Sequence, residues 1–480
     1  MNNISRISDF LFKIKFEDLP TNVIHESKRV LLDSLGCAVA GLDSKKGQYS
    51  VDVSKKLGGP EEASIIGTPY KVSAANAAFA NGETINALDF DAILRPAVHI
   101  TPWVIPSAIG LSERLQSSGK DLLLAIALGH EISNKLAKAL SPKIQLDGSY
   151  DEKTYPEERA PTSGSLPISG YSFNTISSAG ISGKIIGLDS AHLANAIAIA
   201  GYNAPMQSFT QWEQSGTPAL IKYGSAGWVA QTGVIAALLS ESGYTGDVTL
   251  LDGEYGFWKY SGARSWNPNV LFDGLGENWE ILDVRYKKYP CCGITHSALD
   301  AFTYLIEENK LHPTDIEKVT VWLDPTAELP LWQDRKIDDE VKAQFSVAYD
   351  IAVAAFRLKL NWEWLKPETR INPEIINFMN NIEVLALPEY SNIAQQNPSV
   401  QMAIVEIKTR TNSFKKINKF ASGKQSDEKP GFTDQYLEEK FINNTTGHFS
   451  NNSIGKFIQQ LWELESEENV SNLISSLSHS

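Results

Sequence analysis

Two aspartates and a histidine stand close together in the segment NALDFDAILRPAVHITP, residues 86–102. Asp89 and Asp91 are separated by one residue, and His99 follows on the same segment. A carboxylate and an imidazole on one loop can exchange protons near neutral pH, because an imidazole changes its charge there. The structural alternative is that Asp91 caps a turn and His99 is a hydrogen-bonded core histidine. The residues alone leave both interpretations open.

The segment RYKKYPCCGITHSALDA, residues 285–301, combines basic residues with adjacent cysteines and a histidine. A structural zinc site commonly takes two spaced pairs of ligands, and a redox motif separates its cysteines by two residues. The adjacent Cys291 and Cys292 fit neither pattern, so we expect no metal site and interpret them as small residues on a pocket wall. The candidates for contact with a ligand in this segment are Lys287, Lys288, Cys292 and His296. The alternative for the two lysines is a solvated surface position.

A third candidate is a lysine just ahead of an expected helix start. In ALIKYGSAGWVAQTG, residues 219–233, Lys222 precedes a segment rich in Gly and Ala. Free backbone N–H groups at a helix N-terminus attract anions, so a lysine beside them makes a small anion site. The alternative is a surface lysine whose aliphatic stem lies along the helix end. This pattern alone does not decide between the two.

The composition excludes some classes of function. The chain has 480 residues and a net charge of −14, whereas a nucleic-acid-binding protein needs a basic surface, so we expect no nucleic-acid partner. A pocket for an anionic substrate must then be built from local Lys, Arg or His side chains. We find no P-loop, dinucleotide-binding glycine motif, His-Glu-x-x-His or Gly-x-Ser-x-Gly. Nucleotide-dependent, zinc-protease and serine-hydrolase chemistry therefore lack support.

The cysteine count and the apolar runs bear on the compartment. No apolar run approaches the length of a membrane span, and the opening segment lacks an apolar core of signal-peptide length. Three cysteines, an odd and low count, fit a reducing compartment without a disulfide framework. We therefore expect a cytoplasmic protein with no membrane partner.

The elements that must position the candidate residues are mainly helices. Apolar residues recur at helical spacing over 21–41, with Thr21 as the expected N-cap and Gly41 as the stop. Further helices, several of them rich in small residues, are predicted at 73–80, 106–116, 121–140, 174–200 and 226–242. Residues 141–170 carry Pro, Ser, Gly and charge with little periodicity, which predicts a long surface loop.

Strand-like alternation appears only in the later part of the chain. Strands are predicted at 319–323, 382–386 and 403–407, with helical stretches at 341–358 and 432–475. We therefore predict an all-helical domain over 1–268, an α+β domain over 269–422, and C-terminal helices over 423–480 that return to the first domain.

Several of these motifs, taken in order, resemble those of the MmgE/PrpD family, whose members dehydrate 2-methylcitrate, decarboxylate cis-aconitate or epimerise iminodisuccinate. The resemblance runs from about residue 20 to beyond residue 440 and rests on ALDFD…RPAVH, IKYGSAGWVAQTGVIAALLSESGYTG, YKKYPCCGITHSALDA and AQFSVAYDIAVAAF. It implies a mainly α fold with a large all-helical domain and a smaller α+β lid, usually as a homodimer. It also implies an active site between the domains that needs no metal and no cofactor.

The resemblance assigns roles to particular residues. It implies that the catalytic residues are Asp89, His99, Lys222 and Lys287. Around them we predict substrate contacts from Asp91, Tyr171, Cys292 and His296. Two departures stand out: Ile93 occupies the place where decarboxylase-like members carry threonine, and 166–180 lacks the family's second active-site histidine. Ile168 or Ser172 takes the place of that histidine, with Tyr171 as a candidate proton donor.

We therefore predict a cofactor-independent lyase that removes a proton next to a carboxylate in a small anionic di- or tricarboxylic acid. His99 is expected to act as the base, with Asp89 orienting it or serving as its proton partner. Lys222 and Lys287 are expected to stabilise the enolate-like transition state. Dehydration is favoured, and decarboxylation or epimerisation by the same residues are alternatives. A catalytically silent paralogue that binds a ligand is the alternative of another class, with a thiol-redox enzyme third.

Overall fold

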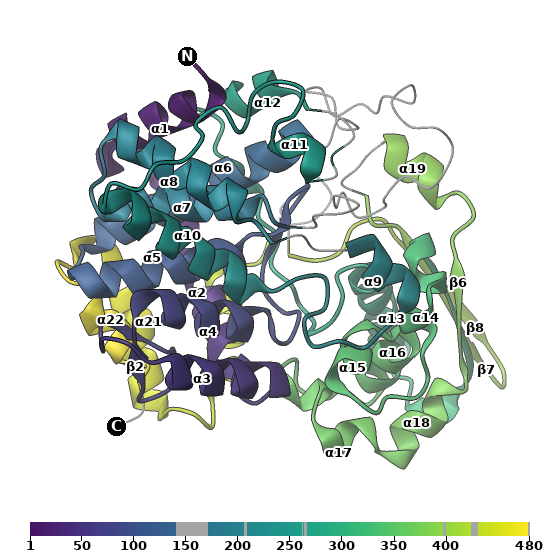
Figure 1. Cartoon of the computed structure of the whole chain (residues 1–480). Helices are drawn as coiled ribbons and strands as arrows, with labels where there is room; N and C mark the ends of the chain where they lie inside the picture. The colour runs from purple at the N-terminus through teal and green to yellow at the C-terminus, as the bar shows by residue number, and fades with distance from the viewer. Residues whose placement is uncertain are drawn as a thin grey trace.

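The computed structural model describes residues 1–140, 171–205, 209–261, 263, 266–396, 400–423 and 431–478 (Figure 1). The loop predicted for 141–170 lies outside these residues. Helices make up most of the described chain up to Phe272, with two very short hairpins among them, and a four-stranded sheet with helices follows. This is the predicted mainly α fold with a smaller α+β part. No helix among the described residues combines the length and apolar character that a membrane span requires.

The helical part follows the apolar patterning of the sequence. Its helices are α1 (Asn3–Lys13), α2 (Thr21–Gly41), α3 (Lys45–Leu57), α4 (Ala74–Asn86), α5 (Thr101–Leu115), α6 (Gly119–Leu140), α7 (Asn174–Ile185), α8 (Ser190–Tyr202), α9 (Phe209–Ser215), α10 (Ala226–Glu241), α11 (Phe257–Tyr260) and α12 (Pro268–Phe272). α2 confirms the helix predicted at 21–41, although its N-cap is Pro20 and Thr21 is its first helical residue. The helix predicted at 174–200 is two helices, because the chain turns at Gly187, whose φ is 76°.

Small residues bring α7 and α10 together at close range. A Cβ at Gly233 of α10 would lie 2.0 Å from Oγ of Ser178 on α7, so a larger residue there would push the helices apart. α10 also packs on α4. Because α4 ends at Asn86 and α10 begins at Ala226, this packing sets the two segments that carry Asp89 and Lys222 side by side.

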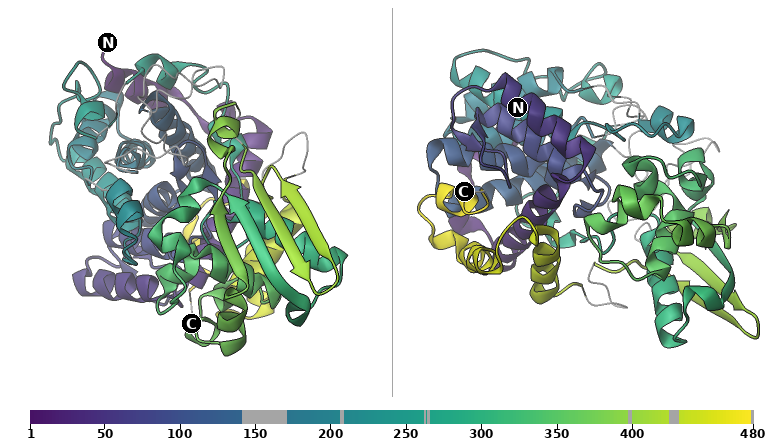
Figure 2. Two further views of the ribbon diagram at one scale, coloured as in Figure 1. Left: turned by 90° about the vertical axis from the view of Figure 1, so that its right-hand side faces the viewer. Right: turned by 90° about the horizontal axis from the view of Figure 1, so that it is seen from below.

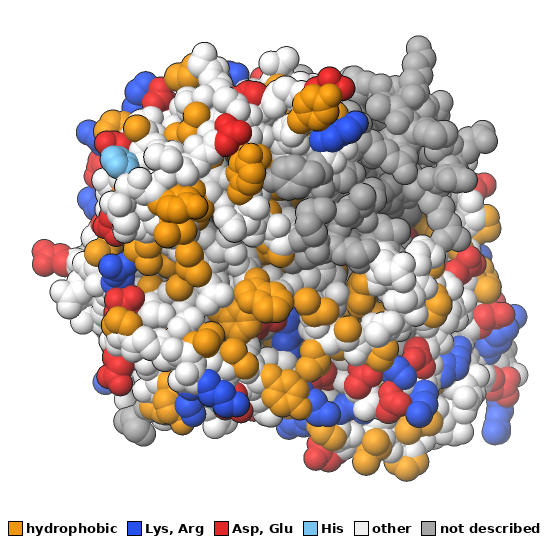
Figure 3. Space-filling view, viewed as in Figure 1, with side chains coloured by type: hydrophobic (Ala, Val, Ile, Leu, Met, Phe, Trp, Pro, Cys, Tyr) orange, Lys and Arg blue, Asp and Glu red, His pale blue; other side chains and the backbone are white. Residues whose placement is uncertain are grey.

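One face of α10 remains open. Trp228, Ile235 and Leu239 lie on the same side of this helix, and their exposed fractions are 53%, 43% and 36%. Tyr49, Val53 and Leu57 of α3 are exposed as well. Figure 3 shows apolar side chains gathered on this face of the molecule, over the region of α10 and α3. The helical part therefore presents an apolar surface that its own chain does not cover within the described residues.

The α+β part is built on a sheet with strand order β6-β5-β7-β8, in which only β5 and β6 are parallel. Its elements are α13 (His296–Glu308), β5 (Ile316–Leu323), α14 (Pro330–Gln333), α15 (Glu340–Phe345), α16 (Val347–Ala355), α17 (Pro367–Arg370), α18 (Pro373–Met379), β6 (Ile382–Ala386), α19 (Tyr390–Gln396), β7 (Ala403–Thr409) and β8 (Ser413–Asn418). β5, β6 and β7 confirm the three predicted strands. α13 packs on β7 and β8, and α16 packs on β6. Figure 2 shows the sheet at the side of the molecule with helices along it.

After the sheet the chain packs on the helical part again. The C-terminal helices are α20 (Asp434–Thr445), α21 (Asn451–Trp462) and α22 (Ser471–Ser475), and α20 lies along α2. Lys440 of α20 forms a buried ion pair with Asp33 of α2 at 2.7 Å. Its Nζ also donates to the backbone oxygen of Phe90 at 2.9 Å. α20 thereby fixes the backbone between Asp89 and Asp91.

Candidate active site

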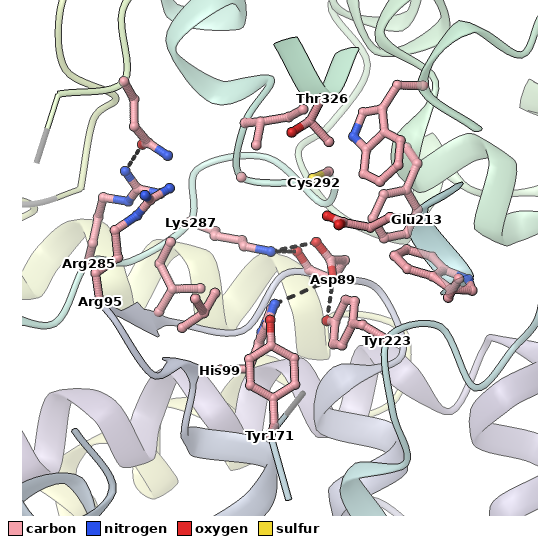
Figure 4. Close-up of a pocket in the computed structure, with 18 residues that line it drawn as sticks. Asp89, Arg95, His99, Tyr171, Glu213, Tyr223, Arg285, Lys287, Cys292 and Thr326 are labelled. Atoms are coloured by element: carbon pink, nitrogen blue, oxygen red, sulfur yellow. Dashed lines mark hydrogen bonds and ion pairs between the residues drawn. The ribbon is translucent and has the colours of Figure 1, made fainter. Parts of the chain in front are cut away.

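A pocket opens where the helical part meets the α+β part (Figure 4). Its lining comes from the segment after α4, from α9 and the loop before α10, and from the segment before α13. The turn after β5, the helices α14 and α15, and the single residues Tyr171 and Gln401 complete it. One wall is aromatic, with Trp212, Trp332 and Phe345 packed edge to face. The remaining lining is rich in charge. A water-excluding wall facing charged groups strengthens every electrostatic interaction inside the pocket.

Backbone pairing brings the two main candidate segments together. The N–H of Ile93 donates to the oxygen of Arg285 at 2.9 Å, and the N–H of Arg285 donates to the oxygen of Ile93 at 2.8 Å. Gln344 joins three further places: its Nε2 donates to the oxygen of Ala87 at 2.9 Å, its Oε1 accepts from Lys222 at 3.0 Å, and its backbone oxygen accepts from Cys292 at 2.8 Å. These bonds determine which side chains meet.

Asp89 is the centre of the charged group and is 1% exposed. Its Oδ2 lies 2.6 Å from Nζ of Lys287, and its Oδ1 lies 3.4 Å from Nζ of Lys222. The hydroxyl of Tyr223 donates to Oδ1 at 2.6 Å. Burial works to raise the pKa of Asp89, but the charges of Lys287, Lys222 and His99 outweigh it and lower that pKa far below its usual range. Asp89 is therefore a carboxylate at neutral pH.

The backbone is strained at this site. Asp89 has φ of 53° and Lys222 has φ of 52°, both in the left-handed region that residues other than glycine rarely adopt. Such conformations persist where the surrounding structure enforces them, and they concentrate at functional sites. Here the two strained residues face each other across an ion pair. The left-handed backbone conformations of Asp89 and Lys222 therefore direct their side chains toward each other.

The two lysines differ in their electrostatic setting. Burial lowers the pKa of Lys222 to about 8, because the attraction of Asp89 offsets only part of the desolvation. Burial also acts on Lys287, but Asp89 and Asp91 outweigh it and raise the pKa of Lys287 above its ordinary value. Lys287 is thus a permanent ammonium, whereas Lys222 begins to lose its charge in mildly alkaline solution.

His99 is oriented by Asp91 rather than by Asp89. Its Nδ1 lies 2.5 Å from Oδ2 of Asp91, while its Nε2 lies 3.9 Å from Oδ1 of Asp89. Burial tends to raise the pKa of Asp91, but His99 lowers it, so Asp91 is ionised and can only accept. Nδ1 must then carry the proton, and a neutral His99 presents the lone pair of Nε2 on its other side. The ring of Tyr223 stacks on that of His99, with 4.7 Å between centroids.

Glu213, on α9, points into the pocket from the side opposite the arginines (Figure 4). Burial raises its pKa to about 8, and the charge of Asp324 adds to this effect. Burial likewise raises the pKa of Cys292 to about 12 and that of Tyr171 well above its usual range. At neutral pH the pocket therefore offers a protonated carboxyl from Glu213, a thiol from Cys292 and a phenol from Tyr171.

The structure brings most of the predicted site residues together. Asp89, His99, Tyr171, Lys287 and Cys292 line the pocket. Asp91 and Lys222 are fully buried directly behind this lining and act on it through His99 and Asp89. His296 is outside the lining; its Nε2 is 3.3 Å from the backbone oxygen of Cys291. Of the residues proposed in place of the second histidine, Ser172 donates to the oxygen of Pro205, and Ile168 lies outside the described residues.

Sequence reasoning missed several members of the site. Tyr223 directly follows Lys222, and Gln344 lies in the AQFSVAYDIAVAAF motif, so the position of each within a family motif is the signal that could have identified it. Glu213, in QWEQSG, carries no recognisable signal. Arg95 and Arg285 line the pocket as well, and they belong to the segments 86–102 and 285–301 that carry Asp89 and Lys287. Among the described residues, no three His, Cys, Asp or Glu side chains are grouped as metal ligands would be.

The four residues Asp89, His99, Lys222 and Lys287 converge on one buried point at the junction of the helical and α+β parts, where an imidazole, a carboxylate and two ammonium groups border one pocket. The chain belongs to the MmgE/PrpD family. The model of the family's N-terminal domain matches residues 5–267, and the model of its C-terminal domain matches residues 289–464.

Curated relatives include cis-aconitate decarboxylases. The enzyme of Aspergillus terreus is 25% identical over 369 residues, which cover 73% of this chain and 71% of the relative. The Homo sapiens enzyme is 30% identical over 318 residues, which cover 64% of this chain and 60% of the relative. The Mus musculus enzyme is 28% identical, with 64% and 61% covered. The chain therefore spans less than two thirds of the length of the two mammalian relatives.

Proposed function

We propose that the chain is a lyase that acts on a small di- or tricarboxylic acid by removing a proton from a carbon next to a carboxylate. The observation that carries this proposal is the convergence of the His99–Asp91 pair with Asp89 and its two lysines on one pocket. A carbon acid of this kind is weakly acidic, so it needs both a placed base and fixed positive charge near the forming enolate. A protein that only binds a ligand does not need a placed base.

The charges of the pocket suit a polyanionic substrate. Four cationic side chains, Lys222, Lys287, Arg95 and Arg285, stand against the two carboxylates Asp89 and Asp91. Nε2 of His99 takes the proton, and the nearby ammonium groups stabilise the negative charge that moves onto the substrate carboxylate. Because Asp89 stays ionised, its part is to hold the lysines in place rather than to exchange a proton.

Two lyase reactions fit this machinery, and we place dehydration first. When the enolate-like species expels a β-hydroxyl, that group must receive a proton to leave as water. Glu213, protonated at neutral pH because burial raises its pKa to about 8, lines the same pocket and can supply this proton. Decarboxylation is the second candidate, supported by the likeness to the cis-aconitate decarboxylases of Aspergillus terreus and Homo sapiens. In that case the proton is delivered to carbon after carbon dioxide departs.

Incubation in heavy water tests the function directly. The purified protein is mixed with citrate, 2-methylcitrate, cis-aconitate, tartrate-like hydroxy acids and iminodisuccinate, and the α- and β-protons are followed by NMR. We expect one compound to exchange or convert, and its product distinguishes dehydration, decarboxylation and epimerisation. If no compound exchanges a proton or is converted, even when further di- and tricarboxylates are added to the panel, the ligand-binding alternative is favoured.

Replacing Glu213 with glutamine is expected to lower turnover by about 100-fold, at the modest end of general acid catalysis, because the pocket loses its proton donor. Exchange of the substrate proton with heavy water should persist, since His99 is intact. The raised pKa means that Glu213 is protonated below pH 8 and ionised above it. Wild-type turnover should therefore fall as pH rises through about 8. Unchanged turnover in Glu213→Gln would remove this role, and Glu254→Gln, outside the pocket, is the control.

We further propose the domain boundaries 1–268, 269–422 and 423–480, a cytoplasmic location, and a homodimer. The break between the two family-model matches, at 267 and 289, supports the first boundary. The homodimer is supported by the family likeness and by the exposed apolar face of α10, formed by Trp228, Ile235 and Leu239. A second copy laid against this face would remove that apolar surface from water.

A charge on the open face of α10 is expected to separate the two subunits. Ile235→Glu places a carboxylate in the proposed contact, so the mass measured by light scattering should fall from two chains to one at micromolar concentration. Ile376→Glu, at another exposed isoleucine on α18, is the matched control and should leave the mass unchanged. A dimer that survives Ile235→Glu, Trp228→Glu and Leu239→Glu would place the contact elsewhere.

A further inference from the structure

Two arginines line the end of the pocket opposite Glu213, and the chemistry around Asp89 does not use them. Arg95 follows β3 (Ile93–Leu94), and Arg285 begins the segment before α13. Figure 4 shows the two guanidinium groups side by side, with Lys287 between them and Glu213. Two like charges placed together repel each other. Their juxtaposition in a pocket points to an anion that is to be bound between or beside them.

Arg285 is the better defined of the two. It is 8% exposed, and its backbone is held by the reciprocal hydrogen bonds with Ile93. Its Nη1 donates to Oε1 of Gln401. Its Nη2 is buried and has no hydrogen-bond partner within the described part of the chain. Gln401 is neutral, so this single bond leaves the charge of Arg285 uncompensated.

The other groups near Arg285 do not neutralise it. Burial and the charge of Arg95 lower the pKa of Arg285 to about 9, against smaller opposing effects of Tyr390 and Asp300. Asp300 already accepts hydrogen bonds from Ser422 and Tyr289 and lies 3.5 Å from Nζ of Lys288. Arg285 is still charged at neutral pH. A buried charge without a partner is costly, which argues that this one has a ligand.

A glycine keeps the space between Arg285 and the reacting centre open. A Cβ at Gly293 would lie 3.4 Å from Nη2 of Arg285, 3.7 Å from Cδ1 of Ile93 and 3.9 Å from Cε of Lys287. Nη2 of Arg285 and the side chain of Lys287 therefore border one small space above Gly293, which is itself part of the pocket lining. A ligand in this space lies against the guanidinium of Arg285 and the side chain of Lys287.

We propose that Arg285, with Arg95 beside it, binds a carboxylate of the substrate that is remote from the carbon that loses its proton. This inference rests on the proposed function and specifies it: the substrate carries one carboxylate at Lys287 and a second at the arginines. A guanidinium suits that second position, since its planar fork can donate two parallel hydrogen bonds to one carboxylate. The pair of arginines thus selects for polycarboxylates over monocarboxylic acids.

Binding of tricarballylate, an inert tricarboxylate without hydroxyl group or double bond, tests the subsite without turnover. Calorimetry compares it with its terminal diamide, which keeps a single carboxylate, in the wild-type protein and in Arg285→Leu. We expect the variant to bind tricarballylate about 100-fold more weakly and the diamide nearly as well as the wild type does. Arg285→Lys, which keeps the charge but not the fork, should fall between. Arg410→Gln, at an exposed arginine after β7, should change neither affinity.

Thermal unfolding separates binding from a structural role. Without ligand, Arg285→Leu is expected to melt no lower than the wild type, because it removes a buried charge that lacks an ion pair. A lower melting temperature with equal loss of affinity for both compounds, in Arg285→Leu and Arg285→Lys alike, would show that Arg285 only braces Gln401. Absence of wild-type binding at millimolar tricarballylate would also overturn the proposal.

The two proposals fail in different ways. If no heavy-water exchange is observed while the affinity difference between tricarballylate and its diamide depends on Arg285, the lyase proposal fails and the subsite stands. If exchange is observed and Arg285→Leu weakens both compounds equally, the lyase proposal stands and the subsite fails.

Discussion

Lys287→Met is expected to lower kcat/KM by about 100- to 1000-fold, the loss usual when one fixed donor to a developing negative charge is removed. Lys287 is the permanent cation of the pair, since Asp89 and Asp91 raise its pKa, and it lies on the pocket lining. Lys222 does not replace it, because burial lowers its pKa to about 8 and its Nζ already donates to the oxygen of Asn86 at 2.6 Å and to Gln344. Steady-state kinetics with the compound identified by NMR measures the effect.

The same change is expected to destabilise the fold by roughly 3 kcal/mol, because the buried Asp89 carboxylate loses its closest cation. Adding Asp89→Asn to Lys287→Met removes the uncompensated charge, so most of that stability should return in urea unfolding while kcat/KM stays low. This double variant separates catalysis from folding. If it recovers activity together with stability, Lys287 serves the fold alone.

The neighbouring lysine is a matched control. Lys288 has a side chain 28% exposed and pairs with Asp300 at 3.5 Å, away from the pocket lining. Lys288→Met removes the same charge from the adjacent position, and kcat/KM should stay within about threefold of the wild type, as for most surface ion pairs. A loss as large as that of Lys287→Met would mean that the net charge of the segment matters and not the geometry at Asp89.

Much of the fold could be predicted because its core elements carry strong periodicity. α2 is buried along most of its length, and its Val, Leu and Ala residues recur at helical spacing. β7 alternates buried and less buried positions, which is the pattern that identifies a strand. In β5 the alternation is one of residue type, with Val319, Val321 and Leu323 set between Thr320 and Trp322, although Thr320 is buried as well. β8 was not predicted: SFKKIN is an edge strand whose only fully buried residue is Asn418, so it lacks apolar alternation and forms by pairing with β7.

The site was predictable residue by residue but not as an arrangement. Asp89, His99 and Lys287 stood out by type and spacing, yet nothing in their order shows that Asp91 rather than Asp89 holds His99. That pairing depends on the turn after α4, where Asp89 adopts a positive φ and aims its carboxylate at the lysines. Arg285 is recognisable as a site residue because it is buried beside Arg95. Glu213 is recognisable because its surroundings of low polarity raise its pKa. Both are properties of the tertiary structure.

His99→Gln is expected to slow exchange of the substrate proton with heavy water by about 1000-fold, within the range typical of a general base. Glutamine can still donate to Asp91, so the fold should be preserved, but it offers no basic nitrogen at the position of Nε2. Asp91→Asn tests the orientation separately and should cost about 100-fold, because an amide no longer holds the Nδ1–H tautomer as a carboxylate does. Far-ultraviolet circular dichroism and thermal melting check both variants, and His312→Gln, at an exposed histidine, is the control.

The pH dependence of exchange decides which group is the base if His99→Gln remains active. Lys222 is the competing candidate, because burial lowers its pKa to about 8 and leaves a fraction of neutral amine near physiological pH. A lysine base works only when deprotonated, so exchange catalysed by Lys222 would rise with pH up to about 8 and then level off. If His99 is the base and needs the ammonium form of Lys222, the exchange rate should instead fall above pH 8, because Lys222 loses its stabilising charge there. Exchange that falls above pH 8 in the wild type and is nearly abolished in His99→Gln assigns proton abstraction to His99, whereas exchange that rises toward pH 8 in both proteins assigns it to Lys222.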